Sequence, residues 1–123
     1  MNTAAFNRID EAEDEFDEAL RANAAGPHVL ARAGAASRAA LLHVSTDYVF
    51  DGEKGEPYVE SDQTHPMSIY GATKLAGEHA VAAAIGVHHF ELGVTVERPG
   101  KEHPAAVRSA WSRTVELISP EAA

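Results

Sequence analysis

The spacing of apolar positions divides the first two thirds of the chain into helical and strand segments. Between residues 10 and 34, apolar or small side chains and one asparagine recur at intervals of three or four, as on one face of a helix: Ala12, Phe16, Ala19, Leu20 and Asn23. Gly26-Pro27 interrupts this pattern, so the segment is either a kinked helix or two helices, the second from His28 to Ala36. Residues 1–8 are expected to be the end of a strand followed by a loop.

A short apolar run from Ala39 to Val44 predicts a buried parallel strand, because it ends abruptly in the small polar residues 45–47. Two glycine turns and two prolines predict a loop over 51–66. Good helix formers then dominate from Ser68 to Ala84 and predict a long helix, which Gly86 would end.

The last part of the chain, from Val87, has a less regular pattern. Apolar residues alternate with other residues at Phe90, Leu92, Val94 and Val96, which predicts a strand. Pro104 suits the first position of a helix. One face of that predicted helix would be formed by Val107, Trp111, Thr114, Val115 and Ile118.

Composition narrows the class of protein. The chain has 123 residues, which favours one domain, and its net charge of -9 disfavours partners such as nucleic acid or an anionic membrane surface. Acidic residues crowd positions 10–18 and predict a solvated helix face. The chain has no cysteine, no long apolar run and no signal-peptide pattern, so a cytoplasmic location is expected. Its seven histidines lack metal-ligand spacing, so no metal site is expected.

Tyr70 and Lys74 form the strongest chemical signal, since residues at i and i+4 share a helix face. An ammonium beside a phenol lowers the pKa of the phenol, which can then protonate a carbonyl oxygen as hydride arrives at the carbon. The pair alone is weak, because a surface tyrosine on a lysine stem has the same spacing. Thr46, at the end of the predicted strand, adds a hydroxyl able to hold a carbonyl beside the phenol. Its other interpretation is a turn or helix cap.

Read together, these segments resemble the dTDP-4-dehydrorhamnose reductase family of extended short-chain dehydrogenases/reductases. The resemblance rests on His43 to Gly52, Pro57 to Glu60, Pro66 and Tyr70 to Glu78. Ala4 to Glu13 and Asn23 to Pro27 agree with it as well, and it covers about residues 2–84.

The resemblance implies a role for each matching residue. Tyr70 would be the general acid, Lys74 its partner and ribose anchor, and Thr46 the third catalytic residue. Asp47 and Tyr48 would line the substrate site. The cofactor would be NADPH or NADH, contacted by Ala4, Ala5, Tyr70 and Lys74. The reaction implied is reduction of a 4-keto nucleotide sugar in dTDP-L-rhamnose biosynthesis.

The chain also departs from the family pattern. No glycine-rich phosphate loop occurs in it, so we expect a fragment without the first βαβ unit and with weak cofactor binding and turnover. The expected fold is α/β, a partial Rossmann-like parallel sheet with flanking helices. Residues 1–84 would be the central part of the reductase domain, and residues 85–123 a divergent tail of strand plus helix.

Whether the chain is an active enzyme stays open at this point. One alternative is a non-catalytic binding or regulatory module of the same fold, and another is a gene remnant. An unpaired sheet edge would favour self-association or a protein partner that supplies a strand.

Overall fold

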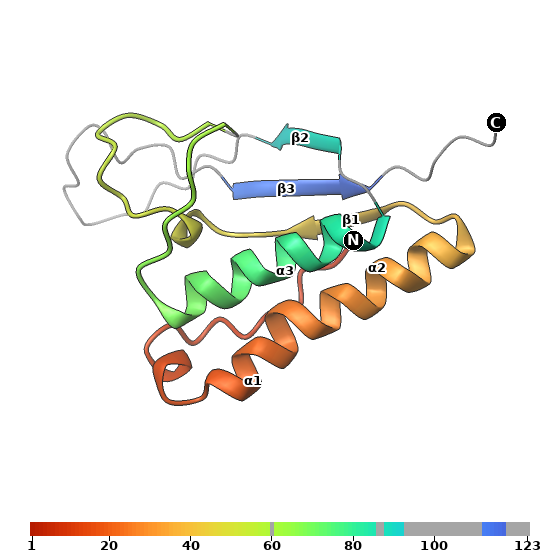
Figure 1. Ribbon diagram of the computed structural model, residues 1–123, viewed down its shortest axis with the longest axis horizontal. Helices are drawn as coiled ribbons and strands as arrows, with labels where there is room; N and C mark the ends of the chain where they lie inside the picture. Colours follow the sequence, from red (N-terminus) through yellow and green to blue (C-terminus); the bar gives the residue numbers. More distant parts are fainter. Residues whose placement is uncertain (60, 86–87, 93–111, 118–123) are drawn as a thin grey trace.

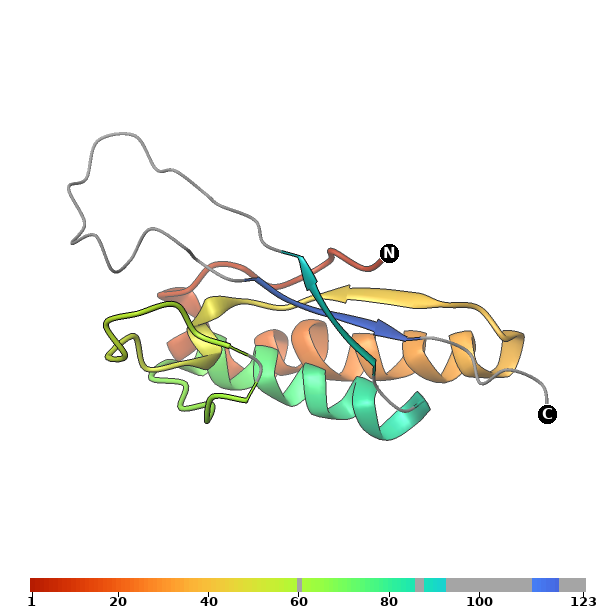
Figure 2. The same ribbon diagram turned by 90° about the horizontal axis from the view of Figure 1, so that it is seen from above.

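Three helices cover one face of a small sheet in the computed structural model, which describes residues 1–59, 61–85, 88–92 and 112–117. The helices are α1 (Phe16–Leu20), α2 (Gly26–Ser37) and α3 (Ile69–Ile85). The strands are β1 (Leu41–Val44), β2 (His88–Leu92) and β3 (Ser112–Leu117). Short 3₁₀ turns occupy Glu11–Glu13 and Asp47–Val49. Seen from above, the helices and the strands form two separate layers (Figures 1 and 2).

The first helical segment is continuous from Phe16 to Ser37, and its irregularity is a π-helical turn at Arg21–Ala25. Proline has no N–H, so Pro27 cannot donate to the carbonyl of Asn23 four residues earlier. A π turn is a common way for a helix to absorb such a missing bond. The interruption predicted at Gly26-Pro27 is therefore present, as a local widening of one helix.

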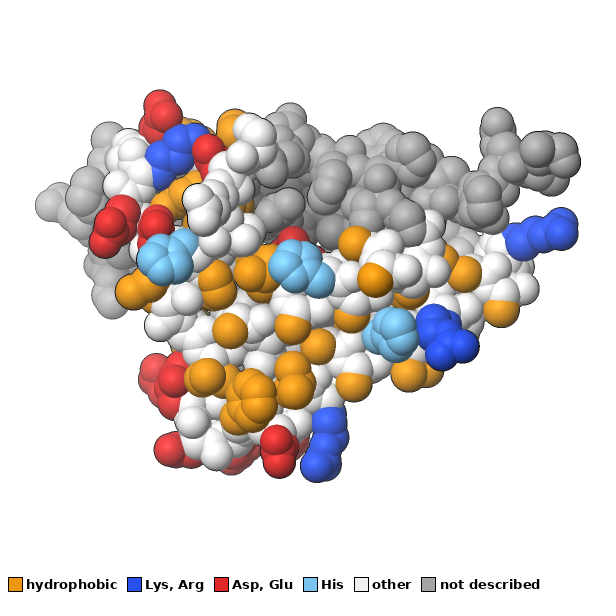
Figure 3. Space-filling model, viewed as in Figure 1, with side chains coloured by type: hydrophobic (Ala, Val, Ile, Leu, Met, Phe, Trp, Pro, Cys, Tyr) orange, Lys and Arg blue, Asp and Glu red, His pale blue; other side chains and the backbone are white. Residues whose placement is uncertain are grey.

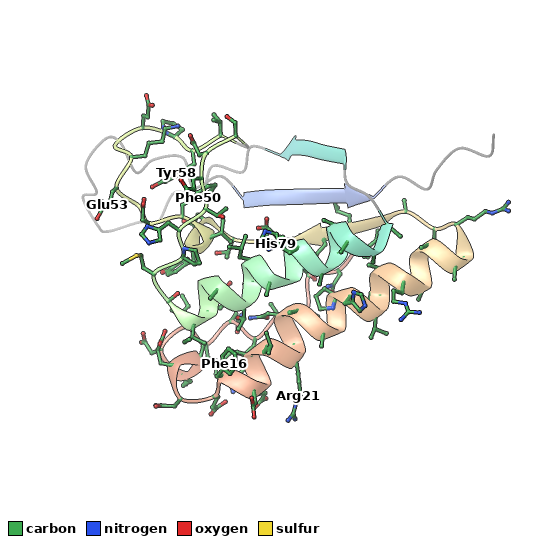
Figure 4. The ribbon with its side chains drawn as sticks, viewed as in Figure 1. Phe16, Arg21, Phe50, Glu53, Tyr58 and His79 are labelled. Atoms are coloured by element: carbon green, nitrogen blue, oxygen red, sulfur yellow. The ribbon has the colours of Figure 1, made fainter. Side chains whose placement is uncertain are left out.

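Burial follows the predicted face except at Leu20, which is half-buried, and at Phe16. Ala12, Ala19 and Asn23 are buried, whereas Phe16 is 45% exposed on α1 (Figure 4). The acidic residues between positions 10 and 18 are all exposed, as predicted, and gather around the start of α1 in Figure 3. Glu13 has a further role, because its Oε1 accepts a hydrogen bond of 2.8 Å from the backbone N–H of Ile69 at the start of α3.

Two small apolar clusters hold the helical layer together and join it to β1. One contains Ala31, Leu41 and Val81 and so links α2, β1 and α3. The other contains Phe6, Ala12 and Ala19, with Ile69 and Tyr70 packed against it. The start of α3 is thereby fixed against the N-terminal segment, which matters for the site.

The sheet has the strand order β1-β3-β2, and both pairings are antiparallel. The α/β class is confirmed, but the predicted parallel sheet is wrong for these three strands. A short apolar run indicates burial and says nothing about the direction of the neighbouring strand. The parallel pairing that the described residues contain is a single bridge between Asn2 and His43, which fits the strand end predicted near the N-terminus.

The predicted helix after Pro104 is also wrong where it can be compared, since residues 112–117 form β3. Thr114 and Val115 are β-branched, and both are paired with β1 and with β2. The predicted strand around Phe90 is confirmed for residues 88–92. Its continuation to Val96, the start of the predicted helix at 104–111 and the helix stop at Gly86 lie outside the described residues.

Candidate active site

The candidate site forms where the carboxyl end of β1 meets the first turns of α3. Thr46 has an extended backbone and begins the 3₁₀ turn Asp47–Val49, where its Oγ1 accepts a bond of 3.3 Å from the N–H of Tyr48. The same hydroxyl donates to Asp47 Oδ1 at 3.2 Å. The turn-capping interpretation of Thr46 is therefore correct, and it places the hydroxyl at the strand end.

Tyr70 lies beside this turn. Its ring meets that of Tyr48 edge-on, with centroids 5.5 Å apart and an interplanar angle of 79°. The side chain of Thr46 lies close enough to the phenol oxygen of Tyr70 to influence its pKa. The structure thus brings together four of the predicted residues, Thr46, Asp47, Tyr48 and Tyr70, although they come from two separate segments.

The electrostatics of Tyr70 differ from the prediction made for it. Burial raises the pKa of the Tyr70 phenol, and the nearby Asp47 carboxylate and Tyr48 raise it further, while the Thr46 side chain acts in the opposite direction. The prediction that Lys74 lowers this pKa is wrong for this structure. The reason is the position of Lys74, whose ammonium is engaged by the strand.

Lys74 is 3% exposed, and its Nζ donates a hydrogen bond of 2.7 Å to the carbonyl oxygen of Val44. This bond ties α3 to the last residue of β1, one residue before Ser45. Burial lowers the pKa of Lys74, and the carboxylate of Glu78 partly opposes that effect. Lys74 is therefore a buried cation held at the end of β1, one helical turn after Tyr70.

Two glycines allow α3 to approach its neighbours closely enough for this geometry. A Cβ at Gly71 would lie 2.2 Å from the carbonyl oxygen of Tyr48, and one at Gly77 would lie 2.0 Å from that of Asn23. Neither distance is tolerable between nonbonded atoms. The Asn23 carbonyl is the one to which Pro27, having no N–H, cannot donate in the helix. Gly77 therefore leaves room for the backbone that the π turn brings against α3.

The Asn23 side chain provides a second connection to α3. Its Oδ1 accepts from the N–H of Phe6 at 2.8 Å, and its Nδ2 donates to the carbonyl of Phe6 and to Thr73 Oγ1, both at 3.1 Å. Thr73 in turn donates to the carbonyl of Tyr70 at 2.9 Å. This chain of bonds positions the segment before Phe6 relative to the helix that carries Tyr70.

Ala4 and Ala5 lie in that segment. The Ala4 N–H donates to Asn2 Oδ1 at 3.1 Å, and Ala4 is exposed while Ala5 is half-buried. Their positions are set by Asn2 and Phe6, and Phe6 shares an apolar cluster with Tyr70. Two small side chains thus lie on a segment that Phe6 connects to the site.

Three buried polar residues of the β1–α3 interface were missing from the predicted site. Ser45 Oγ donates to Glu78 Oε1, and both residues are buried. His43 is fully buried, and its Nδ1 accepts from Asn2 Nδ2 at 3.1 Å. Of these three, Glu78 could have been found from the sequence. It follows Lys74 by four residues and so continues the helix face of Tyr70 and Lys74.

His43 has an unusual environment. Within the described residues its Nε2 is the one buried side-chain nitrogen or oxygen without a hydrogen-bond partner. Burial, helped by the charge of Lys74, lowers the pKa of His43 to about 4. The imidazole is therefore neutral near pH 7.

The residues that the structure describes contain no group of three or more side chains able to hold a metal ion. No helix among them has both the length and the apolar character to cross a bilayer.

These features define a class: an α/β protein in which a tyrosine and a lysine, one helical turn apart, pack beside a hydroxyl at a strand end. The model of the RmlD substrate binding domain family matches residues 1–90. The chain belongs to this family.

Individual relatives agree. The chain is 53% identical over 85 residues to a dTDP-4-dehydrorhamnose reductase of Mycolicibacterium smegmatis, covering 68% of this chain and 26% of that protein. It is 42% identical over 118 residues to one of Mycobacterium tuberculosis (strain CDC 1551 / Oshkosh), covering 93% of this chain and 34% of that protein. The second match extends past residue 84, so the resemblance does not stop at the predicted boundary.

Solved structures give the same relation. A dTDP-4-dehydrorhamnose reductase from Clostridium acetobutylicum superposes with a TM-score of 0.66 at 47% identity, covering 68% of this chain and 30% of that one. One from Bacillus anthracis in complex with NADP has a TM-score of 0.65 at 43% identity, covering 67% of this chain and 29% of that one. The chain thus spans about a quarter to a third of the length of the proteins it resembles.

Proposed function

We propose that this chain carries the catalytic segment of a dTDP-4-dehydrorhamnose reductase, which reduces a 4-keto nucleotide sugar with hydride from NADPH or NADH. The observation that carries the proposal is that the Thr46 and Tyr70 hydroxyls meet at the end of β1, where Lys74 is bound to the carbonyl of Val44. The names of the relatives supply the substrate class, and the Bacillus anthracis reductase supplies the cofactor class.

Each residue of the cluster takes a role from its position. Tyr70 is the proton donor, and because its pKa is raised, the phenol is fully protonated at neutral pH. Thr46 orients the substrate carbonyl oxygen next to that phenol. Asp47 and Tyr48 are exposed beside it and line the sugar site.

The residues present fit one end of a nicotinamide cofactor. The ammonium of Lys74 has three N–H donors, of which one is given to Val44, so donors remain for ribose hydroxyls. Ala4 and Ala5 are small and not fully buried, which leaves room for a dinucleotide along them. When bound, the nicotinamide supplies the hydride.

We expect the 123 residues alone to turn over weakly or not at all. A glycine-rich loop at a helix N-terminus normally supplies the pyrophosphate contacts, and no such motif occurs in this sequence. The Lys74 ammonium is also buried and must be uncovered before it can reach a ribose.

An NADPH titration of the purified chain, followed by nucleotide fluorescence, tests the proposal. Saturable binding that is weakened in Lys74→Ala and retained in Tyr70→Phe is the expected result. Tyr70→Phe should instead abolish any reduction of dTDP-4-dehydrorhamnose. Absence of binding at millimolar NADPH in a chain that is folded by circular dichroism would contradict the cofactor site. A turnover rate like that of full-length reductases would contradict the expected weakness.

A further inference from the structure

A buried carboxylate on α3 belongs to the site without touching the reacting groups. Glu78 is 5% exposed and lies one turn after Lys74, which is 3% exposed. Charged side chains are rarely this buried unless another group compensates them. Lys74 and Glu78 carry opposite charges, and the carboxylate of Glu78 favours the protonated form of Lys74.

The same carboxylate also reaches the strand. Ser45, which is 7% exposed, donates its hydroxyl proton to Glu78 Oε1. Ser45 stands between Val44, whose carbonyl accepts from Lys74, and Thr46, whose hydroxyl meets Tyr70. Two consecutive residues of the strand end are therefore held by two consecutive turns of α3.

We propose that Glu78 is a positioning residue of the reductase site: it supplies the counter-charge of buried Lys74 and, through Ser45, sets the distance of Thr46 from Tyr70. This inference rests on the proposed function for its consequence in catalysis. The coupling of Glu78 to Lys74 and Ser45 can be measured even if the chain has no activity.

Glu78→Gln separates the two roles, because glutamine keeps an oxygen acceptor for Ser45 and removes the charge. Ser45→Ala is the matched control, because it removes the donor and keeps the charge. Among the described residues, His43 on β1 is the other group whose pKa the charge of Lys74 shifts; it is neutral above about pH 6 and so does not interfere at alkaline pH. The chain has three lysines, Lys54, Lys74 and Lys101, so their signals are few enough to assign by single Lys→Arg substitutions.

The experiment is a titration of the lysine ε-carbon resonances by NMR in the full chain. The Lys74 signal should titrate at lower pH in Glu78→Gln than in the wild type, because the carboxylate that favours the ammonium is gone, and at the wild-type position in Ser45→Ala. An unchanged Lys74 titration in Glu78→Gln overturns the proposal, whether or not the chain binds NADPH. A shift without NADPH binding supports the positioning role and counts against the proposed function.

A double-mutant cycle covers the case in which Glu78→Gln does not fold. Lys74→Met with Glu78→Gln leaves neither charge buried, so the double variant should be more stable than the two single losses predict. Recovery of a folded circular dichroism spectrum in the double variant supports the proposal. Additive losses, or a double variant as unfolded as Glu78→Gln alone, overturn it.

Discussion

The β1–α3 interface and the loop of residues 51–65 contain the same kinds of ionisable side chain in opposite surroundings. Each has a lysine beside a carboxylate, namely Lys74 near Glu78 in the interface and Lys54 with Asp62 in the loop. Lys54 Nζ donates to Asp62 Oδ2 at 2.6 Å, and this bond raises the pKa of Lys54. In the interface, by contrast, burial dominates and lowers the pKa of Lys74.

The histidines also differ in their surroundings. His65 is 68% exposed, and its Nδ1 lies 3.4 Å from Asp51 Oδ2. His43 is fully buried, and burial lowers its pKa to about 4. Hydrogen-bonded partners therefore set the pKa values of Lys54 and Asp62 in the loop, whereas burial sets those of Lys74 and His43 in the interface. The predictions below test that contrast.

Gly77→Ala should have the largest effect, because it pushes α3 away from the π turn against which it packs. The new Cβ would lie 2.0 Å from the carbonyl oxygen of Asn23, a backbone atom held by the π turn. We expect a loss of about 3 kcal/mol in the free energy of unfolding, measured by urea denaturation. The matched control is Gly26→Ala, also in a helix, where the nearest atom would be at 3.4 Å. Equal stability of the two variants would show that α3 is not held this closely.

The burial of His43 should make the stability of the fold depend on pH. The pKa of His43 is about 4 in the folded chain and 6.5 in the unfolded chain, so the unfolded state binds more protons between these values. Stability from His43 is complete above pH 6.5 and is lost as the pH falls towards 4, by about 3 kcal/mol. Denaturant titrations across this window should show the slope in wild type and lose it in His43→Gln. His65→Gln should keep the slope, and if it does not, the loop rather than the interface carries the pH response.

The main features of α3 and of the site cluster could be predicted because each depends on local spacing. Helix formers from Ser68 onward predict α3, and the i, i+4 rule places Tyr70 and Lys74 on one face. The apolar run ending at Val44 predicts β1 and therefore the strand-end position of Thr46.

Features that depend on contacts across the fold could not be predicted in this way. The direction of β3 relative to β1 follows from which segment returns beside the strand, and periodicity does not encode it. The orientation of Lys74 towards Val44 instead of Tyr70 depends on how closely α3 approaches its neighbours, since Gly71 admits the carbonyl of Tyr48 and Gly77 that of Asn23. The burial of His43 depends on the same approach.

Replacing the buried Lys74 should cost more stability than replacing Lys54 in the loop. Lys74→Met keeps most of the side-chain volume but leaves the Val44 carbonyl without its donor and Glu78 without its counter-charge. We expect a loss of about 2 kcal/mol in the free energy of unfolding. Lys54→Met is the matched control, and its loss should be smaller because water replaces the lost ion pair. Thermal unfolding of both variants by circular dichroism decides this, and a larger loss in Lys54→Met would reverse the contrast.

The smallest effect is expected in the loop. Phe50 and Tyr58 stack with their centroids 4.1 Å apart and lie next to one another in Figure 4. The Tyr58 hydroxyl donates to Asp51 Oδ1 at 2.6 Å and accepts from the N–H of Lys54 at 3.3 Å. Tyr58→Phe keeps the stacking and removes both bonds, so the free energy of unfolding should fall by about 1 kcal/mol or less.

The location of that effect matters more than its size. Limited proteolysis should become faster within residues 51–65 in Tyr58→Phe, because the turn around Gly52 and Gly55 loses the hydroxyl that joins its two sides. Backbone amide resonances of α3 should stay in place, since its first turn is held from other segments through Glu13, Asn23 and the Phe6 cluster. Shifts that reach Tyr70 or Lys74 would show that the loop and the interface respond as one unit. The opposite pKa shifts of Lys54 and Lys74 would then not reflect two independent environments.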